Sequence, residues 1–234
     1  MLTHVYRNPE PVPLVSQLAV LPFLAGVDGL LRESGEVPGL RITVHRVMSR
    51  EGQGYLQQVC AYITDSGADW RGKVGRTFPV TEGIMGAAYE FGRVWRTKSF
   101  PTREALILVM HENMKRVGDT RDPNTVAIAY LAIPMLGPQG EVVLILYADC
   151  NKLNFFVDDQ LIKHVVAMCK GFCKLFDWLQ HDLPFPNLRN LPLEKGKPAR
   201  EKETLYLSIQ EQVEKIDPPK FKAVPFFNYE AAAA

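Results

Sequence analysis

Residues 130–161 read YLAIPMLGPQGEVVLILYADCNKLNFFVDDQL, and this stretch decides the fold. Two apolar runs, YLAIPML and EVVLILYADC, flank the turn Gly137-Pro138-Gln139-Gly140, which is the pattern of a tight hairpin. The nearly continuous apolar character of both runs predicts strands that are covered on both faces or lie in the middle of a sheet. A long helix with a broad apolar stripe is expected directly after them, over residues 157–179.

The chain upstream of this hairpin predicts further strands separated by short helices. Residues 40–48 and 55–64 are rich in β-forming side chains, and the glycines of SREGQG between them indicate a hairpin. A short strand at 77–80 leads into the helix GIMGAAYEF, which Thr81 is expected to cap and Gly92 to end in the left-handed conformation. A strand at 93–98 and a helix at 102–116 are expected next.

Helices are expected at both ends of the ordered pattern, the first over residues 16–33. Antiparallel hairpins between terminal helices indicate an α+β layered domain, not a doubly wound sheet. We assign residues 1–14 to an extended proline-rich arm, 15–183 to the domain and 184–230 to a charged, proline-rich tail with a possible helix at 202–216. The terminal alanines at 231–234 are interpreted as an artefact and are left out of the argument.

Composition restricts the classes of function. The chain has 234 residues, 47% of them apolar, and a formal net charge of +1, so no overall charge favours nucleic acid or an anionic membrane. Its longest apolar run, 126–133, is too short for a membrane helix. Cys60, Cys150, Cys169 and Cys173 each lie in apolar stretches, which is typical of core thiols in a reducing compartment. We therefore expect a cytoplasmic protein without a nucleic-acid or membrane partner.

Three segments together resemble GAF domains. RTFPVTEGIMGAAYEFGRVWRTKSF, residues 76–100, resembles the strand–short helix–strand centre of that family. Residues 130–161 resemble its closing hairpin and the start of its last helix, and residues 41–63 fit its first hairpin. The resemblance implies a central antiparallel sheet with the N- and C-terminal helices on one face and short helices and loops on the other.

A finer resemblance concerns Asn151, Lys152, Phe155 and Asp159. Cyclic-nucleotide-binding GAF domains of phosphodiesterases carry an Asn-Lys…Phe-x-x-x-Asp-Glu pattern here, and Gln160 replaces its last residue. The resemblance implies a structural motif, in which the lysine and the aspartate pair and hold the last strand to the last helix. A small-molecule ligand such as a cyclic nucleotide is an expectation of the family, not of these residues.

The candidate ligand-binding residues follow from where this family places its pocket, between one sheet face and the short-helix layer. They are Thr81, Gly83, Ile84, Gly86, Trp95 and Arg96. The helix start in TEGIMG offers free backbone N–H groups to an anion or a carbonyl oxygen; alternatively, its glycines only permit a tight turn and close packing. Trp95 is either a pocket wall or a core aromatic residue, and Arg96 either meets an acidic ligand or lies at the surface.

Two features suggest protein partners. The stripe containing Leu161, Val165, Phe172 and Phe176 on the last helix is expected to form a homodimer; the alternative is that it only covers the sheet of a monomer. The tail ends in FKAVPFFNY, which suits docking on a partner protein as a strand or anchor peptide, or folding back over its own domain.

The sequence therefore predicts a non-catalytic sensory or adaptor protein that binds a small molecule and signals through a partner. No motif of a nucleophilic enzyme, a phosphate loop or a metal site is present. A ligand-free dimerisation scaffold is the first alternative. A redox enzyme built on the same fold is the second, and it would require accessible, reactive Cys150 or Cys60.

Overall fold

The structure, a computed structural model, describes residues 12, 14–33, 35–50, 53–64, 67–69, 74–116, 122, 127–182, 205–209 and 215. Its helices are α1 (Leu14–Arg32), α2 (Gly83–Phe91), α3 (Arg103–Arg116) and α4 (Asp159–Asp182), with a 3-10 helix, η2, at Phe155–Val157. Its strands are β1 (Arg41–Arg50), β2 (Gln53–Gln58), β3 (Tyr62–Thr64), β4 (Gly67–Asp69), β5 (Thr77–Pro79), β6 (Trp95–Thr97), β7 (Ala129–Leu136), β8 (Val142–Cys150) and β9 (Tyr206–Ser208).

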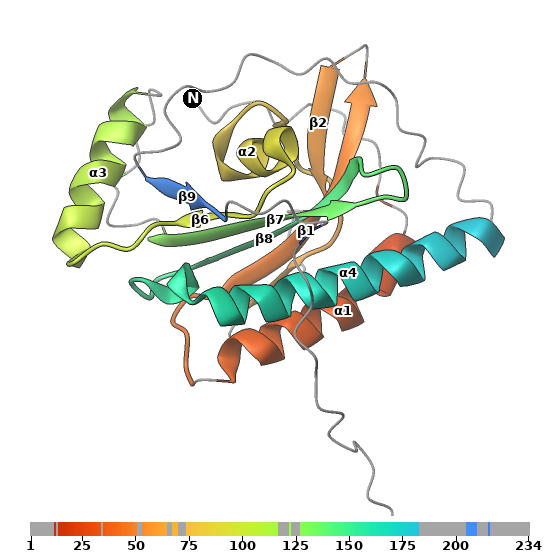
Figure 1. Cartoon of the computed structure of the whole chain (residues 1–234), viewed down its shortest axis with the longest axis horizontal. Helices are drawn as coiled ribbons and strands as arrows, with labels where there is room; N and C mark the ends of the chain where they lie inside the picture. Colours follow the sequence, from red (N-terminus) through yellow and green to blue (C-terminus); the bar gives the residue numbers. More distant parts are fainter. Residues whose placement is uncertain are drawn as a thin grey trace, which may run out of the picture.

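These strands form one sheet, in the order β4-β3-β1-β8-β7-β6-β9. Outside this order, β2 pairs with β1, and β5 pairs with β2. Neighbouring strands are antiparallel. Helices α1 and α4 lie side by side against one face, α2 lies on the opposite face, and α3 stands beyond the β6 and β9 end of the sheet (Figure 1). The α+β, GAF-like fold predicted from the sequence is confirmed.

The face below α1 and α4 is apolar because alternate residues of each strand point to it. Ile42 and Val44 of β1 and Leu146 of β8 are wholly buried there. The two terminal helices close this core, and the rings of Phe23 and Phe172 stack at a centroid distance of 4.5 Å. This packing of the first helix on the last joins the two ends of the domain.

Several predicted boundaries shift. The strand predicted at 55–64 is divided into β2 and β3, both of which pair with β1. The long helix begins at Asp159, not at residue 157. Asp158 caps it, since its carboxylate accepts hydrogen bonds from the backbone N–H groups of Gln160 and Leu161 at 2.8 and 3.3 Å. Thr81 does not cap α2, whose N-cap is Glu82 without a side-chain cap hydrogen bond. Gly92 does end α2 in the left-handed conformation, as predicted.

The dimer prediction needs side chains of α4 that a second copy can reach. Val165 is wholly buried within the chain, so it is unavailable to a second copy. Leu161 and Phe172 are half-buried and already pack against the α1–α4 core. The side chain of Phe176 lies outside the described residues. The width of the stripe is thus explained in part by contacts with α1 and the sheet.

The helix predicted at 202–216 is wrong where the structure describes that segment. Residues 206–208 form β9, which pairs with the edge of β6. Leu205 is buried beside Phe100 and Leu106, under α3. The apolar residues Leu205 and Ile209 suit helical spacing, but β6 offers an unpaired edge, and its backbone hydrogen bonds decide the outcome.

We predict that Leu207→Pro destabilises the fold and Leu207→Ala does not. Backbone hydrogen bonds of 3.1 Å join the strands at two pairs, Val94 with Ile209 and Lys98 with Leu205. Hydrogen-bonded pairs alternate along an antiparallel ladder, so Arg96 and Leu207, which lie midway, form the next such pair, in which the Leu207 N–H donates. Proline removes that N–H, which costs about 1 kcal/mol or more. The alanine variant keeps it, and the replaced side chain is 47% exposed.

Denaturant unfolding and hydrogen exchange at the Lys98 amide measure the effect. Equal stability and equal protection of the proline and alanine variants would show that β9 contributes nothing to the sheet.

Candidate functional site

On the sheet face that α2 covers, polar side chains follow β1 and β8 beside the apolar cluster below α2, whereas the opposite face is apolar. Arg41, Thr43 and His45 alternate along β1 with the core residues of the other face, and Tyr147 and Asp149 do the same along β8. The register places these polar residues directly opposite one another, Arg41 with Asp149 and Thr43 with Tyr147. Because paired residues share a face, the polar side chains gather in the space between the sheet and the α2 layer.

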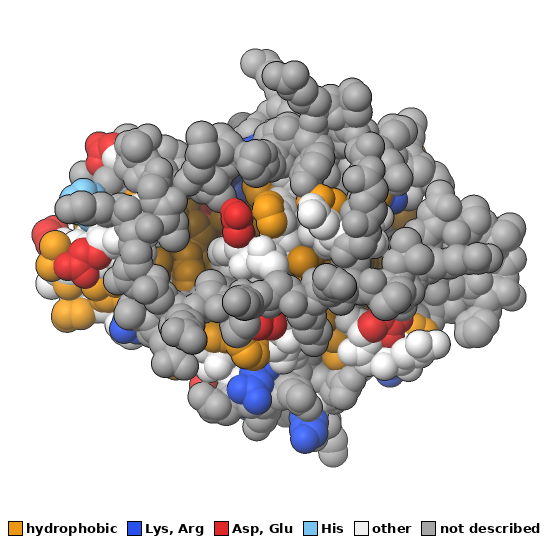
Figure 2. Space-filling view, turned by 90° about the horizontal axis from the view of Figure 1, so that it is seen from above, with side chains coloured by type: hydrophobic (Ala, Val, Ile, Leu, Met, Phe, Trp, Pro, Cys, Tyr) orange, Lys and Arg blue, Asp and Glu red, His pale blue; other side chains and the backbone are white. Residues whose placement is uncertain are grey.

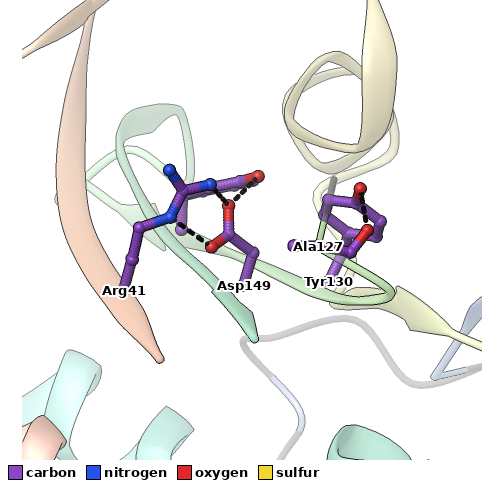
Figure 3. Close-up of polar contacts among 5 residues, drawn as sticks. Arg41, Ala127, Tyr130 and Asp149 are labelled. Carbon is purple, nitrogen blue, oxygen red and sulfur yellow. Dashed lines mark hydrogen bonds and ion pairs between the residues drawn. The ribbon is translucent and has the colours of Figure 1, made fainter. Parts of the chain in front are cut away.

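An ion pair forms one end of this polar face (Figure 3). The Arg41 guanidinium donates two hydrogen bonds to the Asp149 carboxylate, Nε to Oδ1 at 2.7 Å and Nη2 to Oδ2 at 2.6 Å. The hydroxyl of Tyr147 donates a third, at 2.8 Å. The Asp149 side chain is 1% exposed, and these donors replace the water that its carboxylate loses on burial.

The centre of the polar face holds side-chain atoms without partners. Both ring nitrogens of His45, Oε1 of Gln58 and Nε1 of Trp95 are buried and form no hydrogen bond. His45 and Gln58 are wholly buried and lie directly opposite one another on β1 and β2. Burial is the main cause that lowers the pKa of His45 to about 3, with a contribution from Arg76, so the imidazole is neutral and offers one donor and one acceptor.

Three tyrosines also belong to this face. Tyr130 and Tyr206 meet edge to face at a ring-centroid distance of 6.3 Å, and Tyr147 lies on the strand beside Tyr130. All three are half-buried, unlike the closed core beneath α1 and α4. Seen from the α2 side, the molecule is hollowed, and hydrophobic side chains form the floor of the hollow (Figure 2). Tyr206 comes from β9, so the tail supplies one of the three tyrosines.

The sequence-predicted ligand residues divide between two faces. Trp95 and Ile84 lie together in the cluster below α2, with the rings of Trp95 and Phe91 5.7 Å apart. Gly86 is required for packing, because a Cβ there would meet the carbonyl oxygen of Val80 at 2.7 Å. Gly83, at the helix start, has a φ of 65° and open space around it. Ligand binding by these residues stays a prediction.

Arg96 points to the opposite face. Its guanidinium donates to the carbonyl oxygen of Phe156 at 3.0 Å and to the carboxylate of Asp159 at 2.5 Å, while its side chain is 9% exposed. The pairing implied by the family motif is therefore corrected: Asp159 pairs with Arg96, and Lys152 lies over the ring of Phe155 at 5.5 Å. Arg96 holds β6 to the start of α4.

Asn151, the remaining motif residue, holds the end of β8. Its backbone N–H donates to the carbonyl oxygen of Pro38 at 2.8 Å. A Cβ on Gly39 would lie 2.6 Å from Nδ2 of Asn151, so any side chain there would clash with the Asn151 amide. The motif therefore positions loops in this structure.

The thiols of the candidate redox residues are enclosed, and Sγ of Cys60 lies 3.8 Å from the hydroxyl of Thr43. Cys60 and Cys150 are wholly buried among the α1–α4 core residues. Burial raises the pKa of Cys60 and raises that of Cys150 to about 11, which keeps both protonated. Among the described residues, no group of histidine, cysteine and acidic side chains is arranged to hold a metal. Within that same part of the chain, no helix is long and apolar enough to span a bilayer.

Sequence reasoning missed the polar residues of β1 and β8. The signal was present as alternation: over residues 41–45 the polar Arg41, Thr43 and His45 alternate with the apolar residues at 42 and 44. A strand expected to be covered on both faces should be apolar on both. Polar residues on one of two covered faces therefore indicate a buried polar site. Nothing local in the sequence indicated that Tyr206 joins it.

Comparison with known proteins gives matches among solved structures alone. No protein-family model matches the chain, and a search of curated proteins finds no match. The blue-light-absorbing form of the PixJ GAF domain from Thermosynechococcus elongatus is 14% identical, with a TM-score of 0.47, over 71% of this chain and 88% of that one.

Two further solved structures are similar at the same level. A type II free methionine-R-sulfoxide reductase from Thermoplasma acidophilum is 10% identical, with a TM-score of 0.45, over 69% of this chain and 94% of that one. The GAF domain of an Acinetobacter phosphoenolpyruvate-protein phosphotransferase is 10% identical, with a TM-score of 0.43, over 73% and 98%. These likenesses concern the fold and imply no ligand or activity for this chain.

We predict that the two ion pairs differ in their contribution to stability. Asp159→Ala leaves the Arg96 guanidinium, whose side chain is 9% exposed, without its carboxylate, so we expect a loss of about 3 kcal/mol in the free energy of unfolding. Asp149→Ala removes the acceptor of the Tyr147 hydroxyl and of Arg41, but the Arg41 side chain is 40% exposed and water can replace the lost carboxylate, so we expect a smaller loss of about 1–2 kcal/mol.

Denaturant titrations of the two variants provide the comparison. Equal losses would contradict the expectation that the exposure of the remaining arginine decides the cost.

Proposed function

We propose that this protein is a non-catalytic GAF-type sensory or adaptor module that binds a small molecule between the sheet and α2. The observation that supports this best is the set of buried polar atoms without partners on His45, Gln58 and Trp95. An unpaired buried polar group costs about 1–3 kcal/mol, and native structures retain few of them. A ligand that supplies the missing partners offsets this cost when it binds.

The arrangement of β6 supports a route for the signal. Trp95 faces the proposed site, and Arg96, the next residue, holds the start of α4 from the other face. A ligand that contacts Trp95 is thus one residue from the link between the sheet and the last helix. The same strand carries β9, so the tail and α4 are both in contact with β6.

A ligand-free scaffold is the second candidate function. The apolar cluster directly below α2 favours it, because Ile84, Ala87 and Ala132 pack together there and each is at most 5% exposed. That packing accounts for α2, but it leaves the unpartnered atoms of His45 and Gln58 unexplained. The redox alternative is not favoured, because the nucleophilic thiolate is disfavoured at Cys60 and Cys150.

We expect native mass spectrometry of the full chain, purified from its own host, to show a discrete small-molecule mass that denaturation releases. Trp95→Phe keeps the ring and removes the indole N–H, so it should weaken binding by about twofold to tenfold, as expected for one hydrogen bond. Leu18→Ala, at a side chain that is 56% exposed on α1 and lies on the other side of the sheet, is the control.

An unliganded mass for the wild type, together with no thermal shift in a metabolite panel, would favour the scaffold. Equal occupancy in wild type and Trp95→Phe would remove the indole from the site.

The partner contact proposed for the tail needs a truncation that spares β9. Deleting residues 184–229 would also remove Leu205, Tyr206 and the pairing with β6, so loss of binding would have two explanations. A chain that ends at Ile209 keeps the strand. We expect this truncation to lose co-purification with the partner while the Lys98 amide, which donates to Leu205 in β9, keeps its protection against hydrogen exchange.

Unchanged co-purification of the truncated chain would exclude residues 210–229 as the contact and leave α4 as the next candidate.

A further inference from the structure

We infer that His45, Gln58 and Arg76 form a subsite for a small organic acid with a planar hydrogen-bonding edge. Oε1 of Gln58 accepts a hydrogen bond from the ligand, the neutral His45 imidazole offers one donor and one acceptor, and Arg76 pairs with the ligand's negative charge. This inference rests on the proposed function and names the chemistry of the ligand.

The first observation is that two unpartnered groups face one another. His45 on β1 and Gln58 on β2 are a directly opposite pair, so their Cβ atoms are about 5 Å apart. Both side chains are wholly buried. The amide nitrogen of Gln58 donates to the carbonyl oxygen of Cys60 at 2.8 Å, which fixes the amide plane and leaves Oε1 as the free acceptor.

The second observation is a cation without a carboxylate partner. Arg76 lies two residues before Phe78 and shares its face, with the guanidinium 5.4 Å from the Phe78 ring centroid. The His45 ring is 5.5 Å from the same ring, so Phe78 contacts both groups. Among the described residues, no carboxylate pairs with Arg76, whereas Arg41 on the same face is neutralised by Asp149.

The third observation is the aromatic surround. Phe78 and Tyr147 meet the His45 ring edge to face, at centroid distances of 5.5 and 6.0 Å. Rings placed in this way restrict a ligand to a flat group that approaches the imidazole along its edge. A planar amide, imide or heteroaromatic edge has the required shape, and it presents a donor beside an acceptor. An ordered water molecule that satisfies His45 and Gln58 is the competing explanation.

Three probes separate the charge from the hydrogen-bonding edge, and their binding to the full chain is measured by NMR titration. Uracil has the edge alone, benzoate has the charge alone, and orotate has both. We expect orotate to bind at least about tenfold more tightly than either, the factor for one charge-assisted hydrogen bond. Arg76→Met should reduce orotate binding to the level of uracil and leave uracil binding unchanged. Arg103→Met, at an exposed arginine of α3, should change neither.

Binding of none of the probes, or equal binding of orotate to the wild type and Arg76→Met, would overturn the subsite. The proposed function would stand in either case if native mass spectrometry finds another ligand, so the two failures are distinguishable.

The stability of unliganded variants gives a readout independent of any probe. His45→Phe replaces two unpaired nitrogens by carbon at similar shape, and we expect the melting temperature to rise by about 3 °C or more while orotate and uracil binding are lost. His45→Leu, which is smaller, covers the case in which the phenyl ring does not fit. Melting temperatures that fall in both variants would show that water satisfies the nitrogens in solution, and would overturn the subsite.

Discussion

The antiparallel ladder of β1, β8 and β7 is the constraint on which the rest of the structure depends. Its register decides which alternate residues face the terminal helices and which face α2. A shift by one residue would move Ile42 and Val44 out of the core and drive His45 into it. The apolar core and the polar face are thus two consequences of one set of backbone hydrogen bonds.

The two faces of the ladder contribute in different ways. The face under α1 and α4 is closed by apolar packing, which supplies the main driving force for folding. The opposite face holds the register through directed contacts, above all the bidentate pair of Arg41 and Asp149. Directed contacts add little net stability, but they penalise other pairings, because each alternative leaves a charge buried without its partner.

At the other end of the sheet, β6 connects three parts of the molecule. Trp95 faces the α2 side, and Arg96 forms an ion pair with Asp159 at the start of α4. Strand β9 covers the edge that β6 would otherwise expose. An unpaired edge strand invites association with other chains, so its coverage by the chain's own tail also protects the domain. The candidate site, the last helix and the tail all contact this short strand.

Local patterns in the sequence determined the fold class, because alternation, helical spacing and turn residues are properties of neighbouring positions. The hairpin of β7 and β8, the end of α2 at Gly92 and both terminal helices follow from such patterns. The candidate site was predicted only at its α2 border, through Ile84 and Trp95. Its centre depends on pairings between distant segments: His45 with Gln58, Arg41 with Asp149, and Tyr206 with Tyr130. The partners of Arg96 and the strand conformation of β9 were likewise decided by tertiary structure, because a charge or a free strand edge selects its partner from the whole folded chain, and no spacing along the sequence encodes that choice.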